Sequence, residues 1–162
     1  MDVQELRKEF PQLSQTVYGK PLVYLDNAAT SLRPFSVIRT WDHLASSLTA
    51  NLHRAVHHIA ALATEQYEDA RSFVASYINA SSANEIIFTS GATASLNLVA
   101  SSFGRKFISE GDEIIIAESE HHANIVRWQC LCEEVGAVIR VLTVDENGHL
   151  DIDSLEQLIA PR

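Results

Sequence analysis

Residues 89–93, Thr-Ser-Gly-Ala-Thr, form a run of small side chains that could bind an anion. They follow a short apolar segment and precede a segment with helical spacing, so a strand would pass into a helix here. Small residues let backbone N–H groups approach a phosphate, and the positive end of a helix dipole strengthens the attraction. The same run is also typical of an ordinary helix cap. We interpret it as a candidate phosphate site, with a plain cap as the alternative.

Two adjacent histidines, His121 and His122, follow the next apolar segment in the same way. An imidazole at the end of a strand can stack on a flat heteroaromatic ring or exchange protons near neutral pH. Paired histidines there could equally form a solvated turn or bind a metal. Since ligands of open α/β sheets bind beyond the carboxyl ends of the strands, the spacing favours one ligand site that combines these histidines with residues 89–93.

Residues 26–30, which follow the β-prone residues 22–25, form a third segment that could contact a ligand. Their two consecutive small residues, Ala28 and Ala29, would permit close approach of a ligand or of another chain. A plain connection between a strand and a helix explains this segment equally well.

The polar segment 49–58 is rich in histidine. His53 and His57 have the spacing of a metal-binding pair on a helix. No carboxylate stands at a matching offset, so we predict no metal site.

The remaining pattern predicts the elements that position these segments. Helices are expected over residues 3–10, 34–48, 59–78, 92–103, 123–135 and 151–159, and strands over 22–25, 86–88, 113–117 and 138–144. The alternation after residue 85 amounts to two successive strand–helix–strand units, which predicts an α/β fold with three layers, α/β/α. Three mainly parallel strands leave an open edge. We therefore expect an incomplete sheet within a single truncated domain spanning residues 1–162.

Composition limits the partners and the location. The 162 residues are 46% hydrophobic, enough for one domain with a real core. A net charge of −9 argues against a nucleic-acid partner, because phosphate backbones are bound by clustered Lys and Arg. The apolar runs are shorter than the roughly 20 residues that a membrane helix needs. The acidic N-terminus lacks the features of a secretory signal, so we expect a cytoplasmic location and no membrane partner.

Five segments in order and spacing resemble the cysteine desulfurases of the class V aminotransferase family, close to the group that serves the SUF iron–sulfur assembly system. The segments are Tyr24–Ser31, Asn51–His57, Ser90–Thr93, Gly111–Ile115, and Glu120–Val126 with Trp128. The resemblance runs essentially end to end. It implies the first part of the large domain of a pyridoxal 5'-phosphate (PLP)-dependent transferase, of the aspartate aminotransferase type.

The resemblance also implies the cofactor contacts. Ala92 and Thr93 would hold the phosphate of PLP through backbone N–H groups and a hydroxyl. His121 would stack on the pyridine ring and help to move protons during C–S bond cleavage. The bound cofactor would act as the electron sink of the reaction.

The implied substrate is L-cysteine. Ala28 and Ala29 would flank it, and His53 and Arg54 would lie near the active site at the interface of a homodimer. The reaction would give L-alanine and an enzyme persulfide, whose sulfur passes to an acceptor protein for iron–sulfur cluster assembly.

The family further needs a lysine that binds PLP covalently, an Asp paired with the pyridine nitrogen and a nucleophilic cysteine, all well beyond residue 162. The lysines of this sequence are Lys8, Lys20 and Lys106, and its cysteines are Cys130 and Cys132. None of these five is expected to act as the cofactor-binding lysine or the nucleophilic cysteine. We expect a fragment that is inactive by itself. The alternatives are a short non-catalytic relative that acts as a binding or dimerisation partner, and an enzyme similar to selenocysteine lyase.

Overall fold

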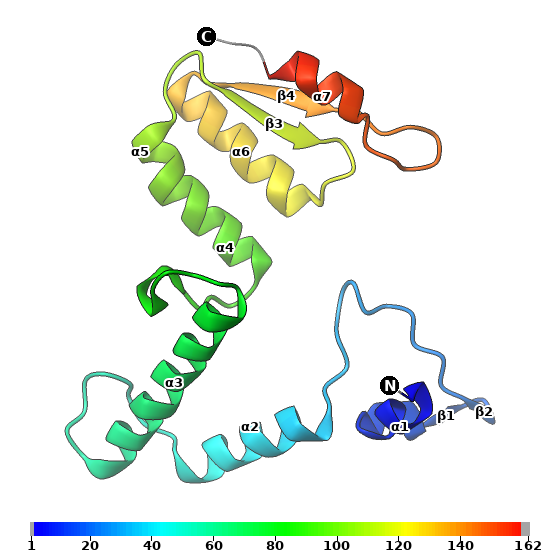
Figure 1. Cartoon of the computed structure of the whole chain (residues 1–162), viewed down its shortest axis with the longest axis vertical. Coiled ribbons are helices and arrows are strands. Elements are labelled where there is room, and N and C mark those ends of the chain that lie inside the picture. Colours follow the sequence, from blue (N-terminus) through cyan, green and yellow to red (C-terminus); the bar gives the residue numbers. More distant parts are fainter. Residues whose placement is uncertain (1, 160–162) are drawn as a thin grey trace. The chain divides into compact units, whose positions relative to one another are not determined.

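The structure is a computed structural model that describes residues 2–159. The chain forms two compact units, Met1–Ile86 and Ile87–Arg162 (Figure 1). The single truncated domain expected from the sequence stays a prediction.

The first unit consists mainly of helices. Its elements are α1 (Val3–Lys8), the 3-10 turn η1 (Pro11–Ser14), the strands β1 (Thr16–Val17) and β2 (Lys20–Pro21), α2 (Phe35–Ser47), α3 (His58–Tyr77) and the 3-10 turn η2 (Ala83–Glu85). The strands β1 and β2 form a two-stranded antiparallel hairpin. The Asp2 carboxylate caps α1 by accepting from the Gln4 N–H at 2.8 Å, and Pro11 follows where the helix has ended.

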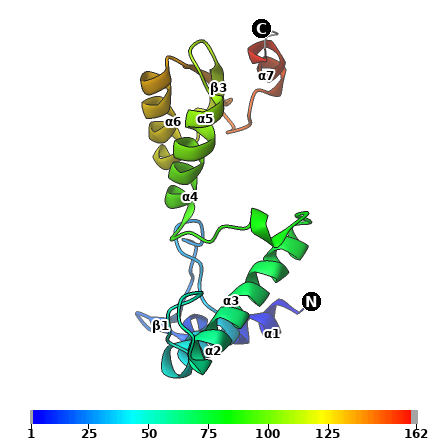
Figure 2. The ribbon, with the colours of Figure 1, turned by 90° about the vertical axis from the view of Figure 1, so that its left-hand side faces the viewer.

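The second unit holds the parallel part of the sheet. Its elements are α4 (Ala92–Val99), the π-helical turn η3 (Ala100–Gly104), α5 (Arg105–Phe107), β3 (Glu113–Ala117), α6 (His122–Val135), β4 (Val138–Leu142) and α7 (Ile152–Leu158). β3 and β4 are parallel and in register from Glu113–Val138 to Ala117–Leu142. In Figure 2 this sheet lies between α6 on one side and α7 on the other. The second unit therefore has the three layers, helix, sheet and helix, of the expected α/β/α fold. Its sheet is incomplete, as expected.

The core of the second unit forms where η3 and α6 pack against each other. Ala100 and Leu131 are fully buried there. A Cβ built on Gly104 would lie 2.5 Å from Leu131 Cδ2, so η3 approaches α6 so closely that a larger residue at position 104 would displace the Leu131 side chain. Two ion pairs, Arg105–Glu134 and Arg140–Glu113, join neighbouring elements at the surface. α6 ends at Gly136, which has φ +79°, the left-handed conformation expected after a helix.

Two strands expected from the sequence are absent. Residues 22–25 and 86–88 have the composition of strands, but neither segment pairs with another strand within residues 2–159. Val23, Leu25 and Ile87 are largely exposed. A strand exists only when its backbone N–H and C=O groups bond to a neighbouring strand. Within residues 2–159 the Leu22 N–H donates to the Gln15 carbonyl at 3.0 Å, but no strand pairs with either segment.

The other expectations agree more closely with the structure. The expected strand 113–117 matches β3, whereas the expected strand 138–144 ends at Leu142, and Val144 makes an isolated antiparallel bridge to Leu150. The expected helix 92–103 begins at Ala92 but changes to a π-helix at Ala100. The helices expected over residues 3–10, 34–48, 59–78, 123–135 and 151–159 are all present with small shifts at their ends.

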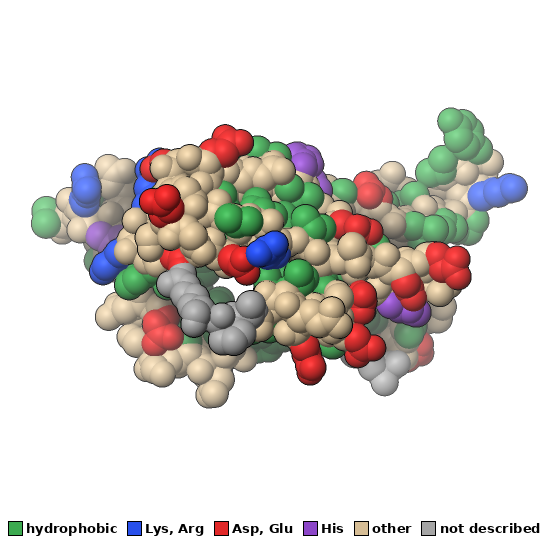
Figure 3. Space-filling view, turned by 90° about the horizontal axis from the view of Figure 1, so that it is seen from above, with side chains coloured by type: hydrophobic (Ala, Val, Ile, Leu, Met, Phe, Trp, Pro, Cys, Tyr) green, Lys and Arg blue, Asp and Glu red, His purple; other side chains and the backbone are tan. Residues whose placement is uncertain are grey.

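The surface is acidic. Asp and Glu number 21 against 12 Lys and Arg, and Figure 3 shows both kinds scattered over the visible face without a basic patch. Within residues 2–159, none of the helices combines the length and the hydropathy that a bilayer span requires.

Candidate active site

The first turn of α4 presents backbone N–H groups that no side chain caps. The N-cap residue is Gly91, and within the described chain no acceptor is found for the N–H of Ala92 or of Thr93. The hydroxyl of Thr89, a candidate cap, lies 2.7 Å from Ser95 Oγ instead. The alternative of an ordinary side-chain cap is therefore not supported, and the N–H groups are available to an anion.

The space in front of this turn is open. Gly91 has φ +153°, a conformation that side chains rarely adopt, and a Cβ built there would meet nothing within 4 Å. A phosphate group needs several converging donors and room to approach them, and the start of α4 provides both. The residues present thus fit the phosphate of a cofactor.

His121 is the N-cap of α6. Its Nδ1 accepts a hydrogen bond from the Ala123 N–H at 3.2 Å, so the neutral ring carries its proton on Nε2. The ring of His122 lies against that of His121, with centroids 4.0 Å apart and planes inclined by 38°. His121 is otherwise exposed. One edge of its ring is therefore fixed by the helix and one face by its neighbour.

The structure brings these two features to one end of the second unit. α4 and α6 pack side by side and begin at the same end, as Figure 1 shows. β3 leads into this end, and His121 follows it closely in the sequence. The helices that follow residues 89–91 and His121 thus start at the same end of the unit, although the strand expected before residue 89 is missing; a single ligand site there stays a prediction.

Ala28 and Ala29 lie in an exposed turn of the first unit. The turn is closed by the Thr30 N–H, which donates to the Asp26 carbonyl at 3.1 Å, and by the Tyr24 hydroxyl, which donates to the Thr30 carbonyl at 2.6 Å. A shallow pocket of about 530 Å³ beside this turn is lined by residues that include Arg7, Tyr24, Asn27 and Ser31. Ala28 and Ala29 do not line this pocket, although their neighbour Asn27 does.

His53 and Arg54 lie in a separate turn that precedes α3. His53 has φ +61°, and α3 begins only at His58, with His57 as its cap. His53 and His57 are therefore not on one helix, and the helical metal-pair spacing does not apply to them. No hydrogen bond or ion pair joins this turn to residues 26–30 within the described part of the first unit.

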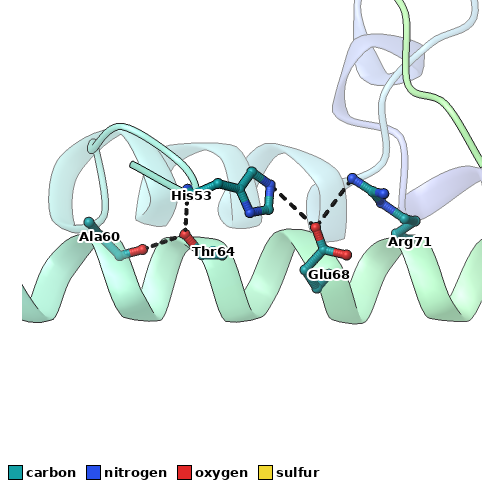
Figure 4. A network of polar contacts seen from close by, with 5 residues as sticks. All are labelled: His53, Ala60, Thr64, Glu68 and Arg71. Atoms are coloured by element: carbon teal, nitrogen blue, oxygen red, sulfur yellow. Dashed lines mark hydrogen bonds and ion pairs between the residues drawn. The ribbon is translucent and has the colours of Figure 1, made fainter. Parts of the chain in front are cut away.

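Sequence analysis missed the residues that hold His53. They are Thr64 and Glu68 on α3, which contact its backbone and its ring (Figure 4). The only signal in the sequence was a polar stripe with a spacing of four, continued by Arg71 three residues later. That stripe does not reveal which distant loop it contacts.

None of the lysines and cysteines belongs to the turn before α4, the N-cap of α6 or the two turns of the first unit. Lys8 pairs with Glu5, and Lys106 lies over the ring of Phe107. Burial raises the pKa of the Cys132 thiol, which makes it a weak nucleophile, whereas Cys130 is exposed. Among residues 2–159, no group of three or more His, Cys, Asp or Glu side chains is placed to hold a metal ion.

Ala28, Ala29, His53 and Arg54 belong to the first unit, while Ala92, Thr93 and His121 belong to the second. The second set forms a candidate cofactor site on its own. The first set supplies two exposed turns.

Comparison with known proteins gives consistent matches. The family model for class V aminotransferases matches residues 23–162. A probable cysteine desulfurase from Halalkalibacterium halodurans is 45% identical over 162 residues, which are 100% of this chain and 40% of that protein. A cysteine desulfurase from Yersinia pestis is 48% identical over 157 residues, 97% of this chain and 39% of that protein. The chain spans only 24% to 40% of the curated relatives that head the comparison.

Solved structures agree with these matches. The apo cysteine desulfurase from Thermococcus onnurineus superposes with a TM-score of 0.84 at 35% identity, covering 97% of this chain and 37% of that one. A cysteine desulfurase from Escherichia coli gives a TM-score of 0.81 at 36% identity, covering 100% of this chain and 39% of that one. A more distant structure, a mutant with glycine covalently linked to its PLP cofactor, shares the fold at 20% identity and a TM-score of 0.70. The chain belongs to the class V aminotransferase family.

Proposed function

We propose that this chain is the N-terminal part of a PLP-dependent cysteine desulfurase. In this proposal it supplies the phosphate end of the cofactor site and the histidine that stacks on the cofactor ring. The observation that carries the proposal is the uncapped first turn of α4 beside α6, whose first turn is capped by His121. The relatives named cysteine desulfurase match almost the whole chain, which supports the same activity.

The phosphate of PLP would be held at the start of α4. The N–H groups of Ala92 and Thr93 would donate to its oxygens, and the Thr93 hydroxyl would add a further bond. The helix dipole favours a dianion at this position. When bound, PLP supplies an electron sink that stabilises the negative charge developed on the substrate carbon.

His121 would orient the ring and move a proton. Because Nδ1 is occupied by the Ala123 N–H, proton exchange would take place at Nε2. Because His122 lies against one face of the imidazole, the opposite face is left for stacking on the cofactor. The same residue would thus combine a fixed ring orientation with one ring nitrogen left for proton exchange.

The substrate would be L-cysteine, flanked by Ala28 and Ala29, with His53 and Arg54 nearby at a homodimer interface. The sulfur would leave as an enzyme persulfide, with L-alanine as the other product, and pass to an acceptor protein for iron–sulfur cluster assembly in the cytoplasm. The lysine and the cysteine for these steps would come from outside the 162 residues, so the chain alone would be inactive.

The test is sulfide and alanine release from L-cysteine by the complete natural protein that carries this sequence, purified with PLP. We expect equal amounts of the two products in the presence of a reductant. The 162 residues expressed alone should release no more sulfide than a blank without enzyme. A complete protein that binds PLP but acts only on selenocysteine, or that forms no alanine, would overturn the proposed activity.

A His121→Ala variant tests the residue role. Loss of a positioned acid–base group lowers kcat by about 10²-fold to 10⁴-fold, so a loss in that range is expected. His43→Ala, which removes an exposed histidine of α2, is the matched control and should stay within about twofold of the wild type because the proposed site gives this side chain no role. Normal activity of His121→Ala would contradict the proposed role.

A further inference from the structure

Glu118 is the first residue after β3, and it is bonded twice to the chain at the end of β4. Its N–H donates to the Leu142 carbonyl at 2.9 Å, and its Oε1 accepts from the Val144 N–H at 3.3 Å. All three residues lie in the second unit, as does His121, which follows Glu118 by three positions. Glu118 is therefore tied to the sheet at the point where the chain turns towards His121.

The side chain of Glu118 takes the place of a main-chain acceptor. β3 and β4 pair in register up to Ala117 and Leu142. One further step of this parallel ladder would direct the Val144 N–H to the Glu118 carbonyl. The strand ends at Ala117 instead, and the chain turns there, with the Glu120 N–H donating to the Ala117 carbonyl at 3.2 Å. The carboxylate of Glu118 thus accepts the bond that its carbonyl would have accepted in a longer strand.

The Val144 N–H depends on this carboxylate. Val144 also forms an isolated antiparallel bridge with Leu150. The two hydrogen bonds of that bridge, at 2.8 Å and 3.1 Å, are made by the residues on either side of Val144 and Leu150. The N–H of Val144 itself therefore points to the opposite side, towards β3. Within residues 2–159 no other acceptor is found for it, so removal of the carboxylate would leave the N–H of a half-buried residue without a protein partner.

We propose that Glu118 is a positioning residue, which fixes the exit of the chain from β3 through the Val144 N–H and so sets the place of the His121 ring at the cofactor. The inference rests on the proposed function, which stacks His121 on PLP. The helix side of His121 is fixed by the Ala123 N–H. Only two residues separate His121 from Glu118 on the strand side, so a looser exit from the sheet would displace the imidazole.

Steady-state kinetics of the complete natural protein with PLP test this role. Glu118→Met nearly keeps the length of the side chain but removes the oxygen acceptor. It is expected to lower kcat about tenfold, with KM for L-cysteine within about twofold, because acid–base catalysis depends on the position of the group. Glu118→Gln keeps an oxygen acceptor and should retain kcat within about twofold of the wild type. Glu133→Met makes the same change at an exposed position of α6 and should have no effect.

A double substitution tests whether Glu118 acts through His121. If it does, Glu118→Met should change kcat by less than about twofold in a His121→Ala background, because the two effects are then not additive. A full tenfold loss of kcat in that background would overturn the inference.

Hydrogen–deuterium exchange of the complete protein, followed by mass spectrometry, gives a readout that does not depend on activity. Peptides that cover residues 118–121 and 143–145 should exchange about tenfold faster in Glu118→Met than in wild type, Glu118→Gln or Glu133→Met, because exchange follows the population of the opened segment. Faster exchange with an unchanged kcat in an active enzyme would overturn the link to His121.

The exchange measurement also separates this inference from the proposed function. Faster exchange in a protein without desulfurase activity would overturn the proposed function, yet it would still establish that Glu118 holds this turn. Unchanged exchange in Glu118→Met, with or without a change in kcat, would overturn the inference itself.

Discussion

Replacing Gly104 with alanine tests how the helix that starts at the candidate phosphate site is fixed to α6. The added Cβ would lie 2.5 Å from Leu131 Cδ2 and 3.6 Å from Trp128. Leu131 is fully buried, so its side chain has no solvent space into which it could turn. Gly104 itself has φ −56° and ψ −56°, a helical conformation that alanine adopts without strain. The steric contact is therefore the main cost of this substitution.

The expected magnitude follows from two opposing effects. Overpacking a core costs about 1–3 kcal/mol. Alanine is more favourable than glycine inside a helix by about 1 kcal/mol. Gly104→Ala should therefore lower the free energy of unfolding by about 0–2 kcal/mol. Leu131→Ala should lower it by about 2–5 kcal/mol, because it removes a fully buried leucine.

The double substitution is the decisive variant. With Leu131 shortened, the new methyl group has room, and only the helix preference remains. Gly104→Ala should then stabilise the Leu131→Ala protein by about 1 kcal/mol, the reverse of its expected effect on the wild type. Urea unfolding of the four proteins, followed by far-UV circular dichroism, measures these free energies. If Gly104→Ala stabilises both backgrounds, or destabilises them equally, the contact with Leu131 is not the reason for glycine at this position.

Three further outcomes are expected. Thr93→Val should weaken PLP binding about tenfold, whereas Thr93→Ser should keep the wild-type affinity. Binding of pyridoxal, which lacks the phosphate, should not change in either variant. Equilibrium titration measures both affinities, and an equal loss for PLP and pyridoxal would contradict a phosphate contact. Cys130 should react with iodoacetamide at least about tenfold faster than Cys132, because burial raises the pKa of the Cys132 thiol. Peptide mapping measures both reaction rates, and equal rates would contradict the burial of Cys132. The hydrogen bond from Arg105 holds the pKa of Glu134 below its ordinary value of 4.5, so the pair stabilises the fold above that pH and the contribution is lost as pH falls through the lowered pKa. The urea midpoint of the wild type should therefore fall more than that of Glu134→Gln in this acid range, and parallel curves would show that the pair contributes nothing.

Several elements could be predicted from the sequence because their signals are local. Asp2 and Asp151 cap α1 and α7 through bonds to N–H groups two and three residues away, a pattern that single residues specify. Gly136 ends α6 in a left-handed conformation for the same kind of reason. The long helix α3 was predicted within one residue at each end, since its apolar residues recur at helical spacing over its whole length.

The missing strands show where local signals are insufficient. Residues 22–25 and 86–88 have strand composition, yet a strand also needs a second strand to pair with, and neither segment pairs with a strand within the described residues. The π-helical turn at Ala100–Gly104 was missed for a related reason. Its sequence continues the pattern of α4, and its packing against Leu131 is a tertiary feature.

The candidate site likewise has features that follow from the sequence and features that depend on tertiary contacts. The sequence by itself determined the family, the candidate phosphate-binding run at Ala92 and Thr93 and the place of His121 after a strand, because these depend on residue types in a fixed order. Only the tertiary structure decided that the first turn of α4 lacks a side-chain cap and that His121 is oriented by its own helix. Only it placed Glu68 against His53, fifteen positions away in the sequence. Contacts of this kind join residues through space, and a pattern of neighbours along the chain carries no information about which distant side chain will complete them.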